Sequence, residues 1–283
     1  MKQVCVFFVL VIFLTFGCQR AKVSKYLSEI DSLIVGELYD SAYHLIMEMN
    51  DSSFHTPEEF AHFNLLRVQT AYLANKPLVS SDSILDVVIS YYDQHVNYEK
   101  LADAYYYKAI GANARGDYQQ SIINYKKAEH LALQSENIRQ QYKIAEGITY
   151  VNGVCANVDL QLSYAKKTLG LSQKIGNRRW IAYSYYWLSY AYSKKGIEDS
   201  VLCYTQQIIP FIKDVNETEL PYFLSGVAYL LRSSNPTEAK KYLLRSLSYN
   251  EQTVTYEYLA EIAYDEGKPE EAYYYWKTLV STK

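Results

Sequence analysis

One short side-chain pattern recurs along nearly all of this 283-residue sequence and constrains the fold more than any other feature. Each full copy has a first residue that is usually small, a large residue four positions later and an apolar or small residue three positions after that. These spacings place the three residues on one face of an α-helix. The copies are Ala42, Ile46 and Met49; Ile84, Val88 and Tyr91; Ser121, Tyr125 and Ala128; Ala165 and Thr168; Ser200 and Tyr204; Ala239, Leu243 and Ser246; and Ala272, Trp276 and Leu279. A pattern repeated at about 40-residue intervals predicts a helical repeat array.

Helix-boundary signals between the copies agree with this register. Gly116 stands where one helix must stop and the chain must reverse, a position that favours a residue tolerant of positive φ. Thr56 and Asn235 each precede a proline and, three residues later, a glutamate, which is the order of a capped helix start. Pro210 is expected to end a second helix. We predict an all-α fold of about seven antiparallel helix pairs, with a local break near residues 75–83.

The first helices of the pairs carry a second pattern, aromatic–x₂–Leu–small–x₂–aromatic. It occurs as Tyr185, Leu188, Ser189 and Tyr192, and again, without the last aromatic residue, as Tyr256, Leu259, Ala260 and Ala263. With the second-helix pattern, this resembles the tetratricopeptide repeat (TPR) family over nearly all of residues 26–280. The sequence departs from the family at Lys108 and Ala112, and the unit at 142–175 has no clear turn glycine. The resemblance implies a right-handed α-solenoid whose first helices line a groove for an extended or helical peptide.

The resemblance also implies which side chains face that groove. The chain holds 31 tyrosines against 9 phenylalanines, and a tyrosine ring buries apolar area while keeping a hydrogen-bonding tip. A trough rich in tyrosine would suit a peptide backbone or apolar side chains, although the same tyrosines could instead pack between repeats. The family's carboxylate clamp is not reproduced. The predicted groove residues are Tyr106, Asn113, Tyr150, Tyr183, Tyr186, Tyr190, Lys194 and Arg232.

The first 18 residues read as an export signal. A lysine is followed by an apolar run from Val4 to Gly17, which is too short to span a bilayer as a helix. The run ends in a segment that resembles a bacterial lipobox, and this implies that Cys18 is lipidated and becomes the new N-terminus. A plain signal peptide or an uncleaved anchor are the alternatives. We therefore divide the chain into a signal at 1–18, a tether at 19–25 and the solenoid at 26–283, and we expect Cys155 and Cys203 to be buried.

Several classes of function have no support in the sequence. A formal net charge of −3 and the absence of a dense basic run argue against nucleic-acid binding. The five histidines are scattered without the spacing of metal ligands. There is no glycine-rich phosphate loop and no Gly-x-Ser-x-Gly motif. We predict a protein that is not an enzyme and that needs no cofactor or metal.

The C-terminal edge is the last feature that the sequence singles out. Repeat arrays normally finish with a helix that turns a polar face to water. Here an apolar stripe of Trp276, Leu279 and Val280 comes close to the last residue. We treat this stripe as a candidate docking edge for a second copy or for another segment, the alternative being that it tolerates partial exposure.

These observations predict a lipid-anchored adaptor of the bacterial cell envelope, on a periplasm-facing membrane leaflet, that binds a protein or peptide partner. Two alternatives stay open. One is a sensory module of a membrane-linked transcriptional regulator whose C-terminal part is absent from this sequence. The other is a lipoprotein that binds a glycan or small ligand, because sugar rings stack on aromatic faces. An exposed, coplanar run of tyrosine rings would favour the glycan.

Overall fold

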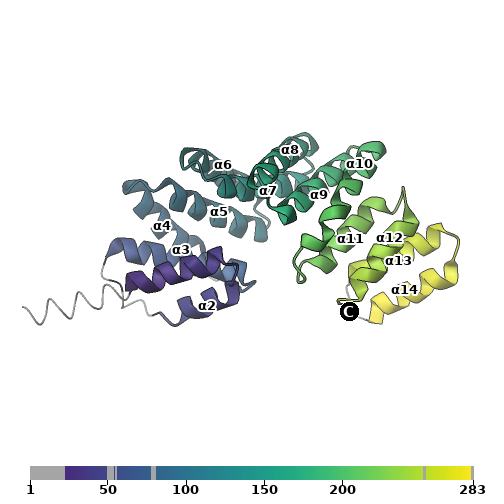
Figure 1. Cartoon of the computed structure of the whole chain (residues 1–283), viewed down its shortest axis with the longest axis horizontal. Helices are drawn as coiled ribbons and strands as arrows, with labels where there is room; N and C mark the ends of the chain where they lie inside the picture. The colour runs from purple at the N-terminus through teal and green to yellow at the C-terminus, as the bar shows by residue number, and fades with distance from the viewer. Residues whose placement is uncertain (1–22, 50–53, 55, 78–80, 251–252, 282–283) are drawn as a thin grey trace, which may run out of the picture. The chain divides into compact units, whose positions relative to one another are not determined.

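The computed structural model describes residues 23–49, 54, 56–77, 81–250 and 253–281, and these contain helices and turns but no strand. The signal at 1–18 with Cys18, and most of the predicted tether, lie outside the described residues. The chain forms two compact units, Met1–Gln140 and Gln141–Lys283 (Figure 1). Within the described part of the chain, no helix combines the length and the apolar character needed to cross a bilayer.

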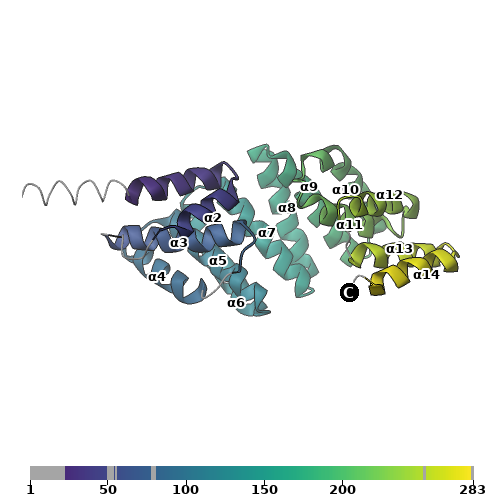
Figure 2. The same cartoon turned by 90° about the horizontal axis from the view of Figure 1, so that it is seen from below.

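The described residues of unit 1 form three helix pairs. The helices of each pair follow one another along the chain and pack side by side (Figure 2). The first pair is a helix over residues 23–35 with α2. The others are α3 with α4, and α5 with α6. The bounds are α2 (Tyr39–Met47), α3 (Pro57–Leu73), α4 (Ser81–Gln94), α5 (Tyr98–Ala114) and α6 (Tyr118–Gln134).

In unit 2, the part of the chain that the structure describes forms four further pairs, which complete the seven predicted. Its first helix, α7, belongs to this unit from Gln141 onward. A 3₁₀ helix over Ile209–Asp214 comes directly after α10. The bounds are α7 (Ile138–Val154), α8 (Val158–Ile175), α9 (Arg178–Lys194), α10 (Glu198–Ile208), α11 (Leu220–Leu231), α12 (Pro236–Leu247), α13 (Thr253–Asp265) and α14 (Pro269–Ser281). The all-α helical-repeat fold predicted from the sequence is confirmed.

The predicted turns and caps have the expected local chemistry. Thr56 Oγ1 accepts from the backbone N–H of Glu59 at 3.1 Å, and the Glu59 carboxylate accepts from the Thr56 N–H at 3.2 Å, which completes a capping box. Gly116 has φ +78°. In the turn between α7 and α8, which lacks a glycine, Ala156 takes φ +58°. Pro210 comes after the end of α10.

The second-helix pattern marks the core face in four helices, and in the other three some or all of its residues are displaced by one position. Val88 in α4 and Ala272 in α14 are buried as predicted. The predicted residues of α6, α8 and α12 are all buried, and so are Ala42 and Ile46 of α2. Met49 follows α2 and is only partly buried. The error arises where two neighbouring residues are both acceptable core side chains, because a period of 3.6 residues does not choose between them. The buried residues are Leu85 and Tyr92 instead of Ile84 and Tyr91, Val201 and Thr205 instead of Ser200 and Tyr204, and Tyr275 instead of Trp276.

The same displacement explains Cys203, which we expected to be buried. Val201 and Thr205 occupy the core face of α10, so Cys203 between them lies on the exposed face. Cys155 is partly buried. We expected a break near residues 75–83, but the two units divide between Gln140 and Gln141. Leu65 of α3 and Leu85 of α4, on either side of the expected break, belong to one hydrophobic core.

Small residues at the helix contacts also carry hydrogen bonds. The Ser121 hydroxyl donates to the carbonyl oxygen of Ala109 at 2.9 Å, from α6 to α5. The hydroxyls of Ser189 and Thr205 lie 2.6 Å apart between α9 and α10. Because these groups are buried, each hydroxyl keeps a polar partner that water would otherwise supply. The small residues therefore both permit close approach and link the two helices of a pair.

Candidate functional site: a tyrosine-lined pocket in unit 2

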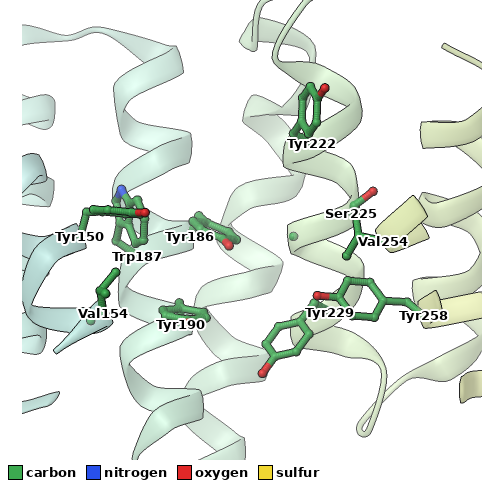
Figure 3. Close-up of a pocket in the computed structure, with 12 residues that line it drawn as sticks. Tyr150, Val154, Tyr186, Trp187, Tyr190, Tyr222, Ser225, Tyr229, Val254 and Tyr258 are labelled. Carbon is green, nitrogen blue, oxygen red and sulfur yellow. The ribbon is translucent and has the colours of Figure 1, made fainter. Parts of the chain in front are cut away.

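A pocket of about 440 Å³ lies in unit 2, on the first helices of four successive pairs (Figure 3). Twelve residues of α7, α9, α11 and α13 line it, and seven of them are aromatic. The lining residues, none of them charged, are Tyr150, Gly153, Val154, Tyr186, Trp187, Tyr190, Tyr222, Ser225, Gly226, Tyr229, Val254 and Tyr258. A pocket of this volume with mostly apolar walls and a few hydroxyl groups has the character of a ligand site.

Helical spacing brings these side chains to one face. Tyr186 and Tyr190 are four residues apart on α9, and their rings stack at 6.2 Å with a 17° angle between planes. Tyr222 and Tyr229 are seven residues apart on α11, so they also share a face. Figure 3 shows Tyr186 and Tyr190 on one wall, with Tyr229 and Tyr258 opposite. Consecutive first helices thus add one strip of aromatic surface each.

Two glycines shape the pocket wall. A Cβ atom at Gly226 would lie 2.8 Å from Cε2 of the Tyr186 ring, so that ring occupies the space that any other residue would fill. A Cβ atom at Gly153 would lie 2.4 Å from Nε2 of Gln161, whose side-chain amide is fully buried. At both positions glycine is required because a neighbouring side chain lies too close to the backbone to leave room for a Cβ atom. Backbone conformation is not the reason, since neither glycine has a positive φ. The wall is therefore sensitive to the addition of a single methyl group.

A carboxyl group anchors the Trp187 indole at the pocket wall. Trp187 Nε1 donates to Oε1 of Glu146 at 3.3 Å, and the Tyr142 hydroxyl donates to the same oxygen at 3.1 Å. The Tyr142 ring stacks on Trp180, with centroids 4.4 Å apart and planes 2° apart. Burial raises the pKa of the Glu146 carboxyl above its ordinary value, while the two hydrogen bonds act in the opposite direction.

Two cations lie against tyrosines of the pocket. Lys194 Nζ is 5.2 Å from the centroid of the Tyr190 ring. Arg232 Cζ is 4.2 Å from the Tyr229 centroid and 5.6 Å from that of Tyr258. All three rings line the pocket, and both distances to the nearest ring are within the range of cation–π contacts.

The structure brings together five of the eight predicted groove residues. Tyr150, Tyr186 and Tyr190 line the pocket, and Lys194 and Arg232 contact its tyrosines. Tyr183 is on the same helix but outside the lining. Its hydroxyl donates to Glu219 at 2.9 Å, and its ring packs on Phe223 at 4.9 Å.

Tyr106 and Asn113 belong to unit 1 and are not part of this pocket. The Tyr106 ring lies 5.9 Å from that of Tyr125 and packs against a hydrophobic core. Asn113 Oδ1 is buried without a hydrogen-bond partner among the described residues. Tyr106 therefore packs among the helices, which agrees with the alternative that some of these tyrosines fill the space between repeats.

The sequence did not identify the lining residues of α11 and α13, among them Tyr222, Tyr229 and Tyr258. Residues 220–231 read LPYFLSGVAYLL, which is apolar on every side, so no periodicity distinguishes the pocket face from the core face. The spacing of the tyrosines could have identified this face. Tyr222 and Tyr229 on α11 are seven residues apart, and Tyr186 and Tyr190 on α9 are four apart, and both spacings place two tyrosines on one face of a helix.

At the C-terminal edge, the three residues of the candidate docking stripe differ in exposure. Trp276 is 40% exposed and Val280 is 74% exposed, whereas Leu279 packs against the hydrophobic core of unit 2. The Trp276 ring lies 5.9 Å from that of Tyr264. Trp276 and Val280 therefore form an exposed edge, whereas Leu279 faces the core.

No protein-family model matches this sequence, and no curated protein matches it either. Solved structures do match. A Rap protein complexed with competence and sporulation factor has a TM-score of 0.72 and 14% identity over 93% of this chain and 76% of its own. NprR in complex with its cognate peptide NprX has a TM-score of 0.63 and 16% identity, over 92% and 78%. The apo form of the quorum sensor NprR from B. thuringiensis has a TM-score of 0.63 and 16% identity, over 95% and 76%. These likenesses show a helical-repeat fold of the TPR type.

Proposed function

We propose that this protein is a non-enzymatic peptide-binding scaffold of the bacterial cell envelope, tethered to a membrane through a lipidated Cys18. The observation that carries the proposal is the pocket of unit 2, in which seven aromatic side chains and no charged one surround about 440 Å³. Tyrosine and tryptophan supply large contact area at a low cost in conformational entropy, which suits the recognition of peptide side chains. The complexes of similar fold with NprX and with competence and sporulation factor agree with this proposal.

Ring geometry favours a peptide over a glycan. A flat sugar-binding platform would need a run of coplanar rings. Among the ring pairs whose members both line the pocket, the planes of Tyr186 and Tyr190 are the most nearly parallel, at 17°. Tyr190 and Tyr229 are inclined by 43°, and Tyr229 and Tyr258 by 44°. Such a surface holds irregular side chains better than the flat face of a sugar.

A sensory role is the second candidate, because the chain shares its fold with the quorum sensor NprR. The same pocket would then receive a signalling peptide. The two candidates differ in the consequence of ligand binding. An adaptor keeps its partner bound at the membrane, whereas a sensor changes the set of proteins it contacts when the peptide is added.

The test is affinity capture of peptides from a random eight-residue library by the immobilised full chain, compared with the variant Tyr186→Ala/Tyr190→Ala. We expect the variant to lose the peptides that the natural chain retains. The matched control is Tyr273→Ala/Tyr274→Ala, which removes two tyrosines that are 67% and 63% exposed on α14, away from the pocket. If both variants retained the same peptides as the natural chain, the pocket would not be the binding site.

A further inference from the structure

Helix α14 presents an exposed face on which apolar side chains lie between two opposite charges. Tyr273, Trp276 and Val280 are 67%, 40% and 74% exposed, and their spacings of three and four residues place them on one stripe of the helix. Glu270 precedes Tyr273 by about one turn and Lys277 follows it by about one turn, so both lie on the same side of α14. Both are exposed. We call these five residues the α14 face.

The preceding helix pair shows what this face does inside the array. The second-helix pattern aligns α12 with α14, and in that register Lys240 corresponds to Tyr273 and Leu243 to Trp276. Leu243 is fully buried in the core that α12 shares with α13 and α14, and the Lys240 ammonium pairs with the carboxylate of Glu271 on α14. The following pair therefore covers this face of α12. Among the described residues, no helix covers the corresponding face of α14.

The aromatic side chains on and beside the α14 face form one surface. Single exposed apolar residues are common on proteins and need no explanation. Here, however, the Trp276 ring lies 5.9 Å from that of Tyr264 on α13, and Tyr264 is itself 63% exposed. Tyr274, next to Tyr273, is also 63% exposed. A continuous aromatic surface of this kind is typical of a contact between proteins.

The charges of the α14 face favour a second copy of this chain as the partner. Glu270 and Lys277 have no ion-pair partner within the described part of the chain, whereas Glu271 has one. The face therefore carries a negative charge at its start and a positive charge about two turns later. When two such faces meet in antiparallel directions, each Glu270 lies opposite a Lys277, and parallel directions would place like charges together. The pattern thus complements its own reverse.

Two acids of α13 also belong to this last helix pair. Asp265 is exposed at the end of α13, beside the start of α14, so a Lys277 brought to that end would meet two carboxylates. Glu257 is exposed in the first half of α13, where it lies beside the pocket residue Tyr258. Asp265 therefore strengthens the antiparallel pairing, and Glu257 adds its charge near the pocket.

We propose that two copies of this chain bind each other through the α14 face, antiparallel about a two-fold axis between Tyr273 and Tyr274. Glu270 of each copy then pairs with Lys277 of the other, and the aromatic side chains between them cover one another. Such a contact uses the same surface on both copies and closes at two chains. It goes beyond the proposed function, because no residue of α14 lines the pocket. The dimer carries two pockets, so a partner with two peptide segments would bind it more tightly than one pocket allows.

The experiment measures the mass of the purified full chain by sedimentation velocity over a concentration series. The test variants are Glu270→Lys and Lys277→Glu, each alone and in an equal mixture of the two. In each variant alone, both pairings become contacts between like charges, whereas a mixed dimer of the two variants restores both pairings. The controls are Glu198→Lys and Lys166→Glu, which reverse exposed charges on α10 and α8.

We expect the natural chain and both controls to sediment as dimers, each test variant alone to dimerise at least about tenfold more weakly, and the mixture to recover the dimer. A natural chain that stays monomeric would overturn the inference, as would test variants that dimerise like the controls. Loss of the dimer in both variants without recovery in the mixture would overturn the antiparallel pairing. None of these results bears on peptide binding, which the proposed function predicts for a monomer and a dimer alike.

Discussion

Trp187 and Glu146 form a fixed pair between α9 and α7, in which the indole N–H donates to the carboxyl group at 3.3 Å. Glu146 lies one helical turn before Tyr150, a predicted groove residue, and is not itself part of the lining. Its effect on the pocket is indirect: it sets the orientation of one aromatic wall. A ligand therefore meets a ring that is already in place and does not have to order it on binding.

Replacement of Trp187 by phenylalanine removes the donor and leaves a ring. We expect the free energy of unfolding to fall by about 1–3 kcal/mol, because the partly buried Glu146 loses a hydrogen bond. Urea unfolding followed by circular dichroism measures this change. Trp276→Phe is the control, since Trp276 is 40% exposed, and we expect about 0.5 kcal/mol or less. Equal losses in the two variants would contradict a specific role for the hydrogen bond.

The raised pKa of Glu146 makes its contribution to stability dependent on pH. A carboxyl whose pKa is higher in the folded than in the unfolded chain stabilises the fold most at low pH, and this contribution declines as pH rises through the folded pKa. Glu146→Gln has no such dependence and keeps an oxygen that accepts from Trp187 and Tyr142. The melting temperature of the variant relative to the natural chain should therefore be more favourable at pH 7 than at pH 4. An identical difference at both pH values would refute this assignment.

Gly226→Ala places a methyl group where the Tyr186 ring now lies. Overpacking should cost about 1–3 kcal/mol in unfolding free energy and displace Tyr186, and peptide binding should weaken with it. Gly170→Ala, in α8, is the matched control, because no atom lies within 4 Å of a Cβ added there. The control should be neutral or stabilising by up to about 1 kcal/mol. Thermal unfolding and peptide affinity, measured on both variants, separate the two outcomes.

Ser225 is the centre of a cluster of buried hydroxyl groups on the core side of the pocket. Its oxygen lies 3.0 Å from that of Ser246 and 2.8 Å from that of Thr255, so it links α11 to α12 and α13. Ser225→Ala leaves Thr255 without this partner and should destabilise the fold by about 1–3 kcal/mol. Thr278→Ala, which removes an exposed hydroxyl, should change stability by about 0.5 kcal/mol or less. Similar effects in chemical denaturation would mean that the cluster does not link the helices.

Cys18 carries the prediction of membrane attachment. Cells expressing the natural chain should yield a protein that enters the detergent phase and whose N-terminal peptide has the mass of a diacylated or triacylated cysteine. Cys18→Ser should abolish both properties, since a hydroxyl cannot form the thioether. Cys5→Ser should retain them. Attachment that survives in Cys18→Ser would favour an uncleaved anchor instead.

The repeat architecture could be read from the sequence because it depends on periodic burial. Residues such as Ala239 and Leu243 must face a neighbouring helix, and capping residues such as Thr56 leave a local signature. The predicted core position was wrong where two neighbouring residues can both fill it. At Tyr275 and Trp276, for example, the structure buries Tyr275. Burial of one instead of the other depends on the neighbouring helix, which a single sequence does not display.

The pocket was predictable only in part. Tyr186 and Tyr190 could be predicted because the resemblance to the TPR family places them on the groove face of a first helix. Tyr229 did not stand out, because α11 is apolar on all sides. The close approach of Gly226 to Tyr186 joins two helices forty residues apart in the chain, and such a contact leaves no local trace.

The position of Trp187 gives the protein an internal optical reporter. The chain has three tryptophans, and Trp187 is the one that lines the pocket, while Trp180 stacks on Tyr142 and Trp276 lies on α14. Indole emission shifts in wavelength when water around the ring is replaced by apolar groups. In the variant Trp180→Phe/Trp276→Phe, the remaining emission therefore reports occupancy of the aromatic pocket directly, without a label on either the protein or the peptide.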